Sequence, residues 1–477
     1  MASPHIVIFP FMAHGHTIPL VDLSKVLSRQ QIKVTIITTP SNAKTIAPTI
    51  DGFRHISLVQ LPFTSIDGLP EGCDCEHTSQ LPSMDFFFPF VIATKRFQKP
   101  FEQVLQSMKN SDDLPICVIS DFFLTWTLGI CQRFGVLRLV FHGMGVLPLL
   151  ISKTLWTNKL QSKSKSSSVS DHLNLLGNLP FNLTIDDLPE DLKITDNNNI
   201  VSKLTAEILE SEMQSWGVIV NSFRELESDY IAQFDSFGPK AWCIGPIFLN
   251  GQMEISNEKT SNGEDEPSTM VMKWLDMQAI ERPESVIYVS FGTQADVSDE
   301  LLEEVALGLE DSGYPFLLVI QSNTWPASSE IEKRVKPRCL ITREFINQRQ
   351  ILFHKAIGGF LSHCGWNSVL ESMAASIPIL AWPLMMDQKL NARYLIDGLG
   401  FGIGIEKEKI KGSGEAISRR EISAGVKELM NGEKGRKARD RASELGQLAK
   451  GAVENGGSSN ETLKNLLRKL SISAESV

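Results

Sequence analysis

The stretch between residues 345 and 388 limits the fold most strongly, because its middle indicates a buried strand, a tight turn and a helix in direct succession. Residues 356–362 form a short apolar run typical of a parallel strand buried on both faces. Residues 363–365 then turn the chain, and residues 366–375 carry apolar side chains at helical spacing. A helix that begins just past a strand end presents free N–H groups and the positive end of its dipole, which favours a phosphate site there.

Polar side chains gather around this predicted turn. His363 stands at the strand exit, where ligands of parallel α/β sheets bind. Asn367 and Ser368 add donors in the first turn of the helix, and Glu371 can accept hydrogen bonds from a ribose diol. Taken separately, Ser368 and Glu371 also fit a helix capping box, and His363 also fits a structural histidine. Their combination at fixed spacing favours a nucleotide site.

A second polar pair follows another apolar run. Residues 377–383 predict a further strand, and Asp387 and Gln388 come after its end. A neighbouring carboxylate and amide suit the hydroxyl groups of a sugar, although such a pair alone is more often ordinary surface polarity. Upstream, residues 285–291 predict the first strand of the same domain, and Thr293 beyond it can reach a diphosphate from the opposite side.

The segment from Phe345 to Gln388 closely resembles the signature segment of plant UDP-dependent glycosyltransferases, and the likeness extends over nearly the whole chain. The resemblance implies that the backbone of Ile346 meets the uracil and that Gln348 and Glu371 hold the ribose. It also implies that His363, Asn367 and Ser368 meet the diphosphate. Trp366, Asp387 and Gln388 would meet the sugar. With Thr293 included, the expected UDP-sugar site comprises Thr293, Phe345, Ile346, Gln348, His363, Trp366, Asn367, Ser368, Glu371, Asp387 and Gln388.

Two positions of this segment bear on the choice of donor. The family usually opens the segment with tryptophan, which stacks on uracil, whereas this chain has Phe345. Phenylalanine still stacks, with less area, so we expect weaker donor binding rather than its loss. Gln388 is the family's usual ending for glucose donors, where histidine would suggest galactose.

Length and composition exclude several classes of protein. A chain of 477 residues predicts two domains. A net charge of −10 argues against nucleic-acid or anionic-membrane binding. The seven cysteines are scattered, which indicates reduced thiols in a cytoplasmic protein, and the nearby group Cys73, Cys75 and His77 fits an exposed loop better than a metal site. We expect no metal, no cofactor, no signal peptide and no membrane span.

The N-terminal half supplies a candidate catalytic pair. Residues 5–9, 17–29 and 33–38 predict a strand, a helix and a strand, but the intervening loop lacks the glycine pattern of a dinucleotide site. His16 lies in that loop beside a helix N-terminus, and Asp121 follows the predicted strand 116–120.

Strand exits in a parallel sheet can face each other, so Asp121 is the natural partner of His16 as a base held by an orienting acid. Alone, His16 fits a structural histidine and Asp121 a helix cap. The resemblance implies that these two residues are the catalytic pair and that the base is His16, which follows Gly15, and not the nearby His14.

The acceptor pocket and the domain boundaries are less sharply defined. The aromatic-rich residues 84–101 predict a helix that lines a pocket for a flat apolar acceptor, with plain core packing as the alternative. The expected pocket residues are Phe87, Phe88, Phe123 and Met385. We expect an acceptor-binding domain (1–249), a polar linker (250–268), a UDP-sugar-binding domain (269–455) and a C-terminal helix (456–477) that packs on the first domain.

By resemblance, the expected fold is GT-B: two doubly wound, Rossmann-like parallel-sheet domains that face each other across a cleft. The expected function is an inverting UDP-glucose-dependent O-glucosyltransferase, monomeric and cytoplasmic, that acts on a flavonoid, phenolic or other small apolar plant metabolite. A C- or N-glycoside product, or another UDP-sugar, is the main alternative. An NAD-dependent dehydrogenase and a non-catalytic nucleotide-sugar sensor are more distant, because the dinucleotide fingerprint is absent and the candidate base and its partner are present.

Overall fold

The computed structural model describes residues 4–63, 75–161, 179, 181–193, 199–254, 267–293, 297–320, 325, 338–344, 346–405, 408–410 and 414–474. The chain divides into two compact units. The first comprises Met1–Leu175, Asp191–Ser256 and Ala449–Val477, and the second comprises Leu176–Glu190 and Asn257–Leu448. The predicted linker lies largely outside the described residues, and the bounds of the four segments given above stay predictions.

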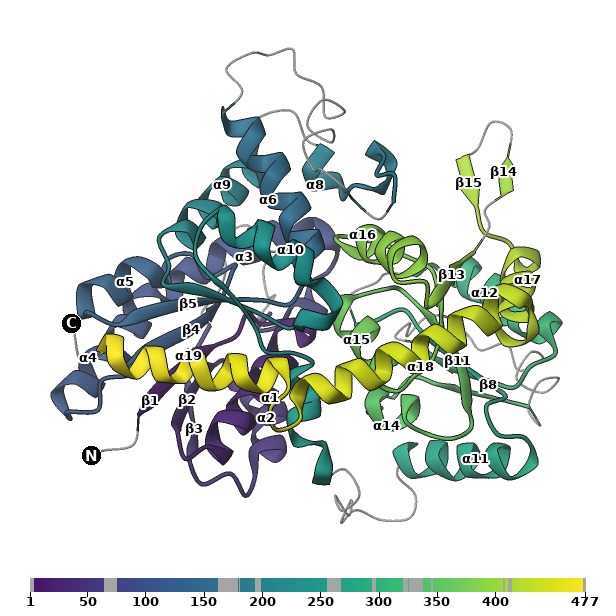
Figure 1. Ribbon diagram of the computed structural model, residues 1–477, viewed down its shortest axis with the longest axis horizontal. Helices are drawn as coiled ribbons and strands as arrows, with labels where there is room; N and C mark the ends of the chain where they lie inside the picture. The colour runs from purple at the N-terminus through teal and green to yellow at the C-terminus, as the bar shows by residue number, and fades with distance from the viewer. Residues whose placement is uncertain are drawn as a thin grey trace. The chain divides into compact units, whose positions relative to one another are not determined.

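Within the described residues, the first unit is built on a seven-stranded parallel sheet with the order β3-β2-β1-β4-β5-β6-β7 (Figure 1). Its strands are β1 (His5–Phe9), β2 (Lys33–Thr38), β3 (Ile56–Gln60), β4 (Cys117–Asp121), β5 (Leu137–His142), β6 (Gly217–Val220) and β7 (Ala241–Cys243). The order runs outward from β1 in both directions, which is the doubly wound arrangement. Most strands are buried on both faces, as their continuous apolar sequences predict.

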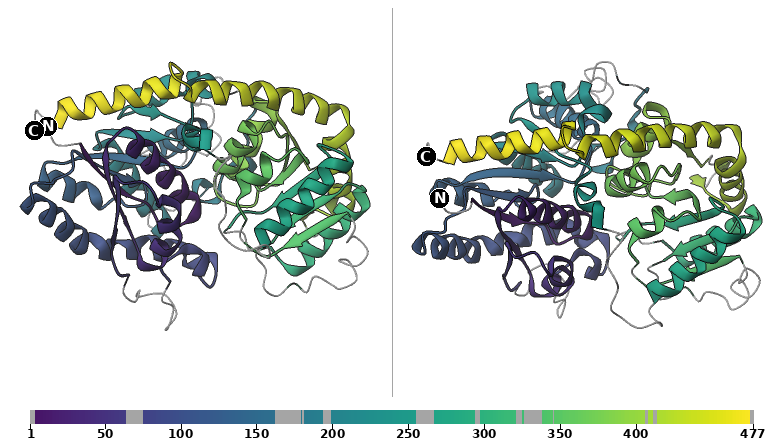
Figure 2. Two further views of the ribbon diagram at one scale, coloured as in Figure 1. Left: turned by 90° about the horizontal axis from the view of Figure 1, so that it is seen from below. Right: turned by 60° about the horizontal axis from the view of Figure 1, so that its bottom comes forward.

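Helices cover the first sheet, and the last helix of the chain is one of them. The helices are α1 (His14–Arg29), α2 (Pro40–Ile46), α3 (Phe87–Ala93), α4 (Gln98–Asn110), α5 (Thr127–Phe134), α6 (Val146–Gln161), α8 (Glu190–Lys193, at the unit boundary), α9 (Ile200–Met213), α10 (Arg224–Ser236) and α19 (Ser458–Ala474). The side chains of Leu463, Leu466 and Leu470 on α19 enter the same buried cluster as Leu20, Leu23 and Leu27 on α1. Figure 2 shows α19, in yellow, lying along the first unit in both views.

Within its described residues, the second unit contains a six-stranded parallel sheet with the order β10-β9-β8-β11-β12-β13. Its strands are β8 (Val286–Ser290), β9 (Phe316–Val319), β10 (Cys339–Thr342), β11 (Ile357–Ser362), β12 (Ile379–Ala381) and β13 (Gly402–Gly404), with a separate antiparallel pair β14 (Glu408–Ile410) and β15 (Gly414–Ala416). The helices are α11 (Pro267–Glu281), α12 (Asp299–Ser312), α14 (Gln348–Leu352), α15 (Trp366–Ala374), α16 (Gln388–Arg393), α17 (Arg419–Asn431) and α18 (Glu433–Val453). α12 and α17 pack together over one face of this sheet.

Short helical turns connect these elements. They are η1 (Ala47–Ile50), η2 (Thr78–Gln80), η3 (Met84–Phe86), η4 (Thr94–Phe97), η6 (Ile185–Asp187), η7 (Ile247–Glu254) and the π-type turn η8 (Tyr394–Gly398). Among the described helices, none is both long enough and apolar enough to cross a membrane.

The two Rossmann-like, doubly wound domains confirm the predicted fold class. Three local predictions need correction. The helix after β1 begins at His14 instead of residue 17, and β4 ends with Asp121 instead of just before it. The predicted helix over residues 84–101 is broken into η3, α3, η4 and the start of α4.

The cysteines also differ in one place from the expected set of reduced thiols. Cys117, Cys131, Cys243, Cys339 and Cys364 are free and buried. Cys75, by contrast, is disulfide-bonded. The expectation of reduced thiols is therefore wrong at Cys75.

Replacement of Leu466 by alanine tests the contribution of α19 to the first core. Leu466 is 2% exposed, so Leu466→Ala removes buried apolar contacts and leaves a cavity. We expect a loss of about 2–5 kcal/mol in the stability of the first unit, measured by thermal or urea unfolding. The matched control is Leu448→Ala on α18, because Leu448 is 40% exposed. Equal losses for the two variants would contradict a core role for α19.

Candidate functional site

The candidate catalytic pair lies at the carboxyl edge of the first sheet. β1 and β4 are neighbours in the sheet, so the loop after β1 and the end of β4 emerge side by side. His16 Nδ1 lies 2.7 Å from Asp121 Oδ2. Asp121 is 0% exposed, whereas the His16 side chain keeps 19% of its surface accessible. The structure thus brings the two predicted residues into hydrogen-bond contact.

This hydrogen bond fixes the tautomer of the neutral His16 ring. An ionised carboxylate only accepts hydrogen bonds, so Nδ1 of His16 carries the proton, and in the neutral ring Nε2 is the basic nitrogen. The second oxygen of Asp121, Oδ1, accepts the backbone N–H of Phe123 at 3.0 Å, which fixes the carboxylate in place. The arrangement leaves one ring nitrogen able to take a proton from a bound molecule.

Aromatic rings surround His16. The ring centroid of His16 lies 5.4 Å from that of Phe11 and 5.6 Å from that of Phe123. Phe87 contacts Phe123 at 5.6 Å and Phe88 at 5.5 Å, so the predicted pocket residues of the first unit form one aromatic group with Phe11. Phe88 and Phe123 are half-buried, while Phe87 is buried and belongs to the core. Met385, the fourth predicted pocket residue, belongs to the second unit.

Behind Asp121, a buried arginine supports the end of β4, the strand that carries it. Arg138 Nε donates to Ser120 Oγ at 2.9 Å, and Arg138 Nη1 donates to Ser211 Oγ at 2.7 Å. Burial lowers the pKa of Arg138 to about 10, which still leaves it charged at neutral pH. Sequence reasoning missed Arg138, because an arginine in a buried strand gives no local sign of its partners.

A second buried charge cluster lies on the far side of Phe122. His142 stacks on Phe122 with centroids 4.6 Å apart, and its Nε2 lies 2.7 Å from Glu212 Oε2. Lys153 Nζ donates to Glu212 Oε1 at 2.8 Å. Burial alone would raise the pKa of Glu212, but the hydrogen bonds and charges of His142 and Lys153 lower it to about 2. Glu212 is therefore ionised at neutral pH.

His14 and His77 lie close to each other, with ring centroids 4.1 Å apart. Burial lowers the pKa of His14, and burial lowers the pKa of His77 to about 3. His77 Nδ1 accepts the backbone N–H of Ser79 at 3.0 Å and so caps a helical turn. Cys73 lies outside the described residues. Within the part of the chain that the structure describes, no group of histidine, cysteine or carboxylate side chains is arranged to hold a metal ion.

In the second unit, β11, a tight turn and α15 form the predicted strand, turn and helix. Cys364 in this turn has a φ of 64°, in the left-handed region. The ring of His363 fits against two glycines, since a Cβ at Gly292 would lie 2.7 Å from His363 Nε2 and one at Gly365 would lie 2.6 Å from it. Burial lowers the pKa of His363 to about 4, so the ring is neutral at pH 7.

A hydrogen-bonded network joins the predicted ribose residues. Gln348 Nε2 donates to Glu371 Oε2 at 2.8 Å and to Ser368 Oγ at 2.9 Å. Arg349 Nε donates to Glu371 Oε1 at 2.8 Å, and Tyr288 Oη donates to Gln348 Oε1 at 3.2 Å. Gly365 occupies the N-cap of α15, so the capping-box alternative for Ser368 and Glu371 is wrong. Sequence reasoning missed Arg349 and Tyr288.

The predicted sugar pair lies at the start of α16, where Asp387 is the N-cap and Gln388 is the first helical residue. The amide oxygen of Gln388 accepts two backbone N–H groups, from Leu384 and Met385, each at 2.9 Å. Asp387 Oδ2 accepts a hydrogen bond from Asn391 Nδ2 at 2.8 Å. Asn391 was also missed, although its spacing of four residues from Asp387 places the two on one helical face.

The remaining predicted donor residues lie around the same sheet edge. Ile346 precedes α14 and is buried, and Trp366, the first residue of α15, is buried as well. Asn367 and Thr293 are half-buried, and Thr293 follows β8, the neighbour of β11. Phe345 lies outside the described residues, so its expected stacking on uracil stays a prediction.

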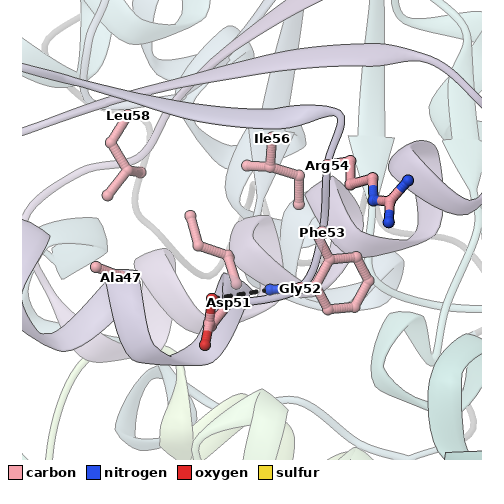
Figure 3. Close-up of a pocket in the computed structure, with 8 residues that line it drawn as sticks. Ala47, Asp51, Gly52, Phe53, Arg54, Ile56 and Leu58 are labelled. Atoms are coloured by element: carbon pink, nitrogen blue, oxygen red, sulfur yellow. Dashed lines mark hydrogen bonds between the residues drawn. The ribbon is translucent and has the colours of Figure 1, made fainter.

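A surface hollow of about 340 Å³ lies elsewhere in the first unit, between η1 and β3 (Figure 3). Its only carboxylate, Asp51, accepts the N–H of Gly52 at 3.0 Å, and its lining contains no histidine. The hollow is lined by Ala47, Ile50, Asp51, Gly52, Phe53, Arg54, Ile56 and Leu58. These residues offer no chemistry comparable to that of His16 and Asp121.

The chain has the two Rossmann-like domains that are typical of glycosyltransferases of the GT-B class. A solved structure supports this class: Phytolacca americana UGT2 complexed with UDP-2fluoro-glucose and pterostilbene. It superposes with a TM-score of 0.78 at 26% identity, over 98% of this chain and 100% of that chain. Residues 262–445 match the family model of UDP-glucoronosyl and UDP-glucosyl transferases.

Relatives identify the family more narrowly. UDP-glycosyltransferase 73B4 of Arabidopsis thaliana is 37% identical over 98% of this chain and 98% of its own length. Scopoletin glucosyltransferase of Nicotiana tabacum is 32% identical over 99% of this chain and 98% of its own length. The chain belongs to the plant UDP-glycosyltransferase family and is an enzyme of the hexosyltransferase type.

The neutral state of His363 predicts a pH dependence of stability. In the unfolded chain this histidine takes up a proton near its ordinary pKa of 6.5, whereas in the folded chain it does so only near pH 4. Because the unfolded state binds the extra proton, stability should fall between pH 6.5 and pH 4, by roughly 3 kcal/mol from this residue. His363→Gln should flatten the decline of the thermal midpoint with falling pH. The two curves of thermal midpoint against pH, for the wild-type chain and for His363→Gln, are aligned at pH 7.5. Equal slopes below that pH would contradict the neutral state of His363.

Proposed function

We propose that the protein is an inverting, UDP-glucose-dependent O-glucosyltransferase that acts on a flavonoid, phenolic or other small apolar plant metabolite. The observation that carries the proposal is the 2.7 Å contact between His16 Nδ1 and Asp121 Oδ2 beside an aromatic group. A bound hydroxyl needs a base, and this contact orients a histidine, the side chain best suited to take a proton near neutral pH. The aromatic rings suit a flat apolar acceptor.

The proposed reaction is a single displacement. His16 Nε2 removes the proton of the acceptor hydroxyl while that oxygen attacks the anomeric carbon of the donor sugar. The bond between the anomeric carbon and the diphosphate oxygen breaks, and UDP leaves with the electron pair. Asp121 stabilises the imidazolium that forms. One displacement from the face opposite the leaving group inverts the configuration at the anomeric carbon.

The second unit, in this proposal, holds the donor. The free N–H groups at the start of α15 stabilise the leaving diphosphate, with side-chain help from Asn367, Ser368 and Thr293. His363 acts there as a neutral hydrogen-bonding group, because burial lowers its pKa to about 4. Gln348 and Glu371 hold the ribose, and Asp387 and Gln388 meet the sugar. The UDP-sugar is a substrate, and the proposed steps use no cofactor.

Two relatives support the choice of donor and acceptor. The name of the tobacco enzyme states a glucosyl transfer to scopoletin, and the Phytolacca structure holds pterostilbene together with a UDP-fluoroglucose. Scopoletin and pterostilbene are both phenols. Phenols bind well among aromatic rings and lose their proton readily, which suits a neutral histidine base. The monomeric state and the cytoplasmic location stay predictions from the sequence.

The catalytic assignment is tested by His16→Ala. We expect the turnover number to fall by about 10²–10⁴-fold, because general-base assistance is lost. UDP binding should persist, because His16 belongs to the first unit and the donor residues to the second. The matched control is His14→Ala, which removes a neighbouring histidine and should keep most of the activity. Loss of UDP binding in His16→Ala, or equal activity loss in both variants, would overturn the proposed division of roles.

The substrate assignment is tested by UDP release from UDP-glucose with flavonoids, simple phenols and terpenoid alcohols. We expect release with at least one phenolic class, and NMR should show a β-linked O-glucoside, because displacement inverts the α-linked donor. An α-linked product would contradict the single displacement. A C- or N-glycoside, or activity only with UDP-galactose or UDP-xylose, would favour the alternative functions.

A further inference from the structure

One buried side chain next to the donor residues has no part in the proposed reaction. Asn391 lies on α16, three residues beyond Gln388, and is 0% exposed. Burying an amide costs free energy unless its polar atoms form hydrogen bonds. The hydrogen-bond partners of Asn391 therefore indicate its role in the structure.

The NH₂ group of Asn391 donates to two oxygens at once. Its Nδ2 lies 2.8 Å from Asp387 Oδ2 and 3.0 Å from the backbone oxygen of Cys364. Both partners are acceptors, so only the nitrogen of the amide can face them. The amide oxygen has no hydrogen-bond partner in the described part of the chain. The side chain is therefore committed to these two contacts.

The contact with the backbone oxygen of Cys364 braces the turn after β11. Cys364 has a φ of 64°, a conformation that costs free energy for any residue except glycine. The hydroxyl of Ser362 accepts the N–H of Cys364 at 3.1 Å, and Asn391 binds the carbonyl of the same residue. The backbone N–H and the carbonyl of Cys364 are thus both held by hydrogen bonds. These bonds also fix the backbone next to His363 and so the direction of its side chain.

The contact with Asp387 fixes one member of the predicted sugar pair. With Oδ2 bound to Asn391, the carboxylate of Asp387 cannot rotate freely. Gln388 is fixed by other hydrogen bonds, because its amide oxygen accepts the backbone N–H groups of Leu384 and Met385. The oxygen of Gln388 is then used, and only its NH₂ group is left to meet a ligand. Asp387 can offer an acceptor and Gln388 a donor in fixed directions.

We propose that Asn391 is a positioning residue of the donor site, which aligns the carboxylate of Asp387 for the sugar and braces the Cys364 turn beside the diphosphate. This inference rests on the proposed function, because it takes Asp387 as a sugar contact. Nothing in Asn391 itself touches the substrate. It affects the reaction through the two oxygens that it holds in place, the backbone oxygen of Cys364 and Oδ2 of Asp387.

The test separates binding of the sugar from binding of the nucleotide. Calorimetry measures the dissociation constants of UDP-glucose and of UDP for the wild-type chain, Asn391→Leu and Asn391→Asp. Asn391→Leu keeps the side-chain volume and removes both donors, whereas Asn391→Asp keeps the shape and sets a carboxylate against Asp387. We expect UDP-glucose binding to weaken by at least tenfold in both variants. UDP binding should weaken less, because UDP lacks the sugar.

A matched control removes a comparable amide from the first unit. Asn42 is buried, and its Nδ2 donates to Thr39 Oγ1 at 2.7 Å and to the backbone oxygen of Glu76 at 3.0 Å. Asn42→Leu therefore loses the same kind of contacts without touching the donor residues. It should lower the thermal midpoint but leave UDP-glucose binding unchanged. An equal loss of UDP-glucose binding in Asn42→Leu would mean that the effect is general destabilisation.

A double-mutant cycle decides whether Asn391 acts through Asp387. The quantity compared is the ratio of the UDP to the UDP-glucose dissociation constant. Asn391→Leu should lower this ratio about tenfold in the wild-type background and less than twofold in Asp387→Ala, because coupled residues are not additive. Equal factors in both backgrounds, or an unchanged ratio, would overturn the inference alone. A wild-type chain that neither binds UDP-glucose nor transfers glucose would overturn the proposed function as well.

Discussion

Parallel pairing of neighbouring strands is the constraint on which both sites depend. In the first unit, β1 pairs with β4 so that Phe9 lies opposite Ser120, and the chain therefore leaves both strands at one edge. In the second unit, β8 pairs with β11 so that Ser290 lies opposite Ser362. A slip of one residue would move each side chain of a strand to the opposite face of the sheet, so the packing of both buried faces fixes these registers. The registers in turn decide which polar side chains meet.

The features that could be predicted from the sequence are those that need only local patterns or the order of the strands. The apolar run before His363 and the helical spacing after it correspond to β11 and α15, within a residue at each end. The approach of His16 to Asp121 follows from two adjacent strand exits. The identity of the bound groups is a different matter, because it rests on the resemblance and on the proposed reaction.

Features set by distant contacts or by several competing local preferences could not be predicted. The aromatic run from residue 84 to residue 101 divides because Pro89 and Pro100 are tolerated only in the first turn of a helix, and α3 and α4 each begin two residues before a proline. Arg138 and Asn391 acquire their roles from residues that the sequence does not place beside them. A buried polar side chain gives no periodic signal, and its partners become known only with the fold.

The position of α19 bears on how the chain folds during synthesis. The core of the first unit includes Leu463, Leu466 and Leu470, which are synthesised after the whole of the second unit. Until they emerge, the apolar surface of α1 and its neighbouring strands has no cover from this helix. The last strand of the second sheet, β13, ends at Gly404, so all strands of that sheet are synthesised before α19. Domains usually fold in the order of synthesis, whereas here the first unit is completed only after the second unit has been made.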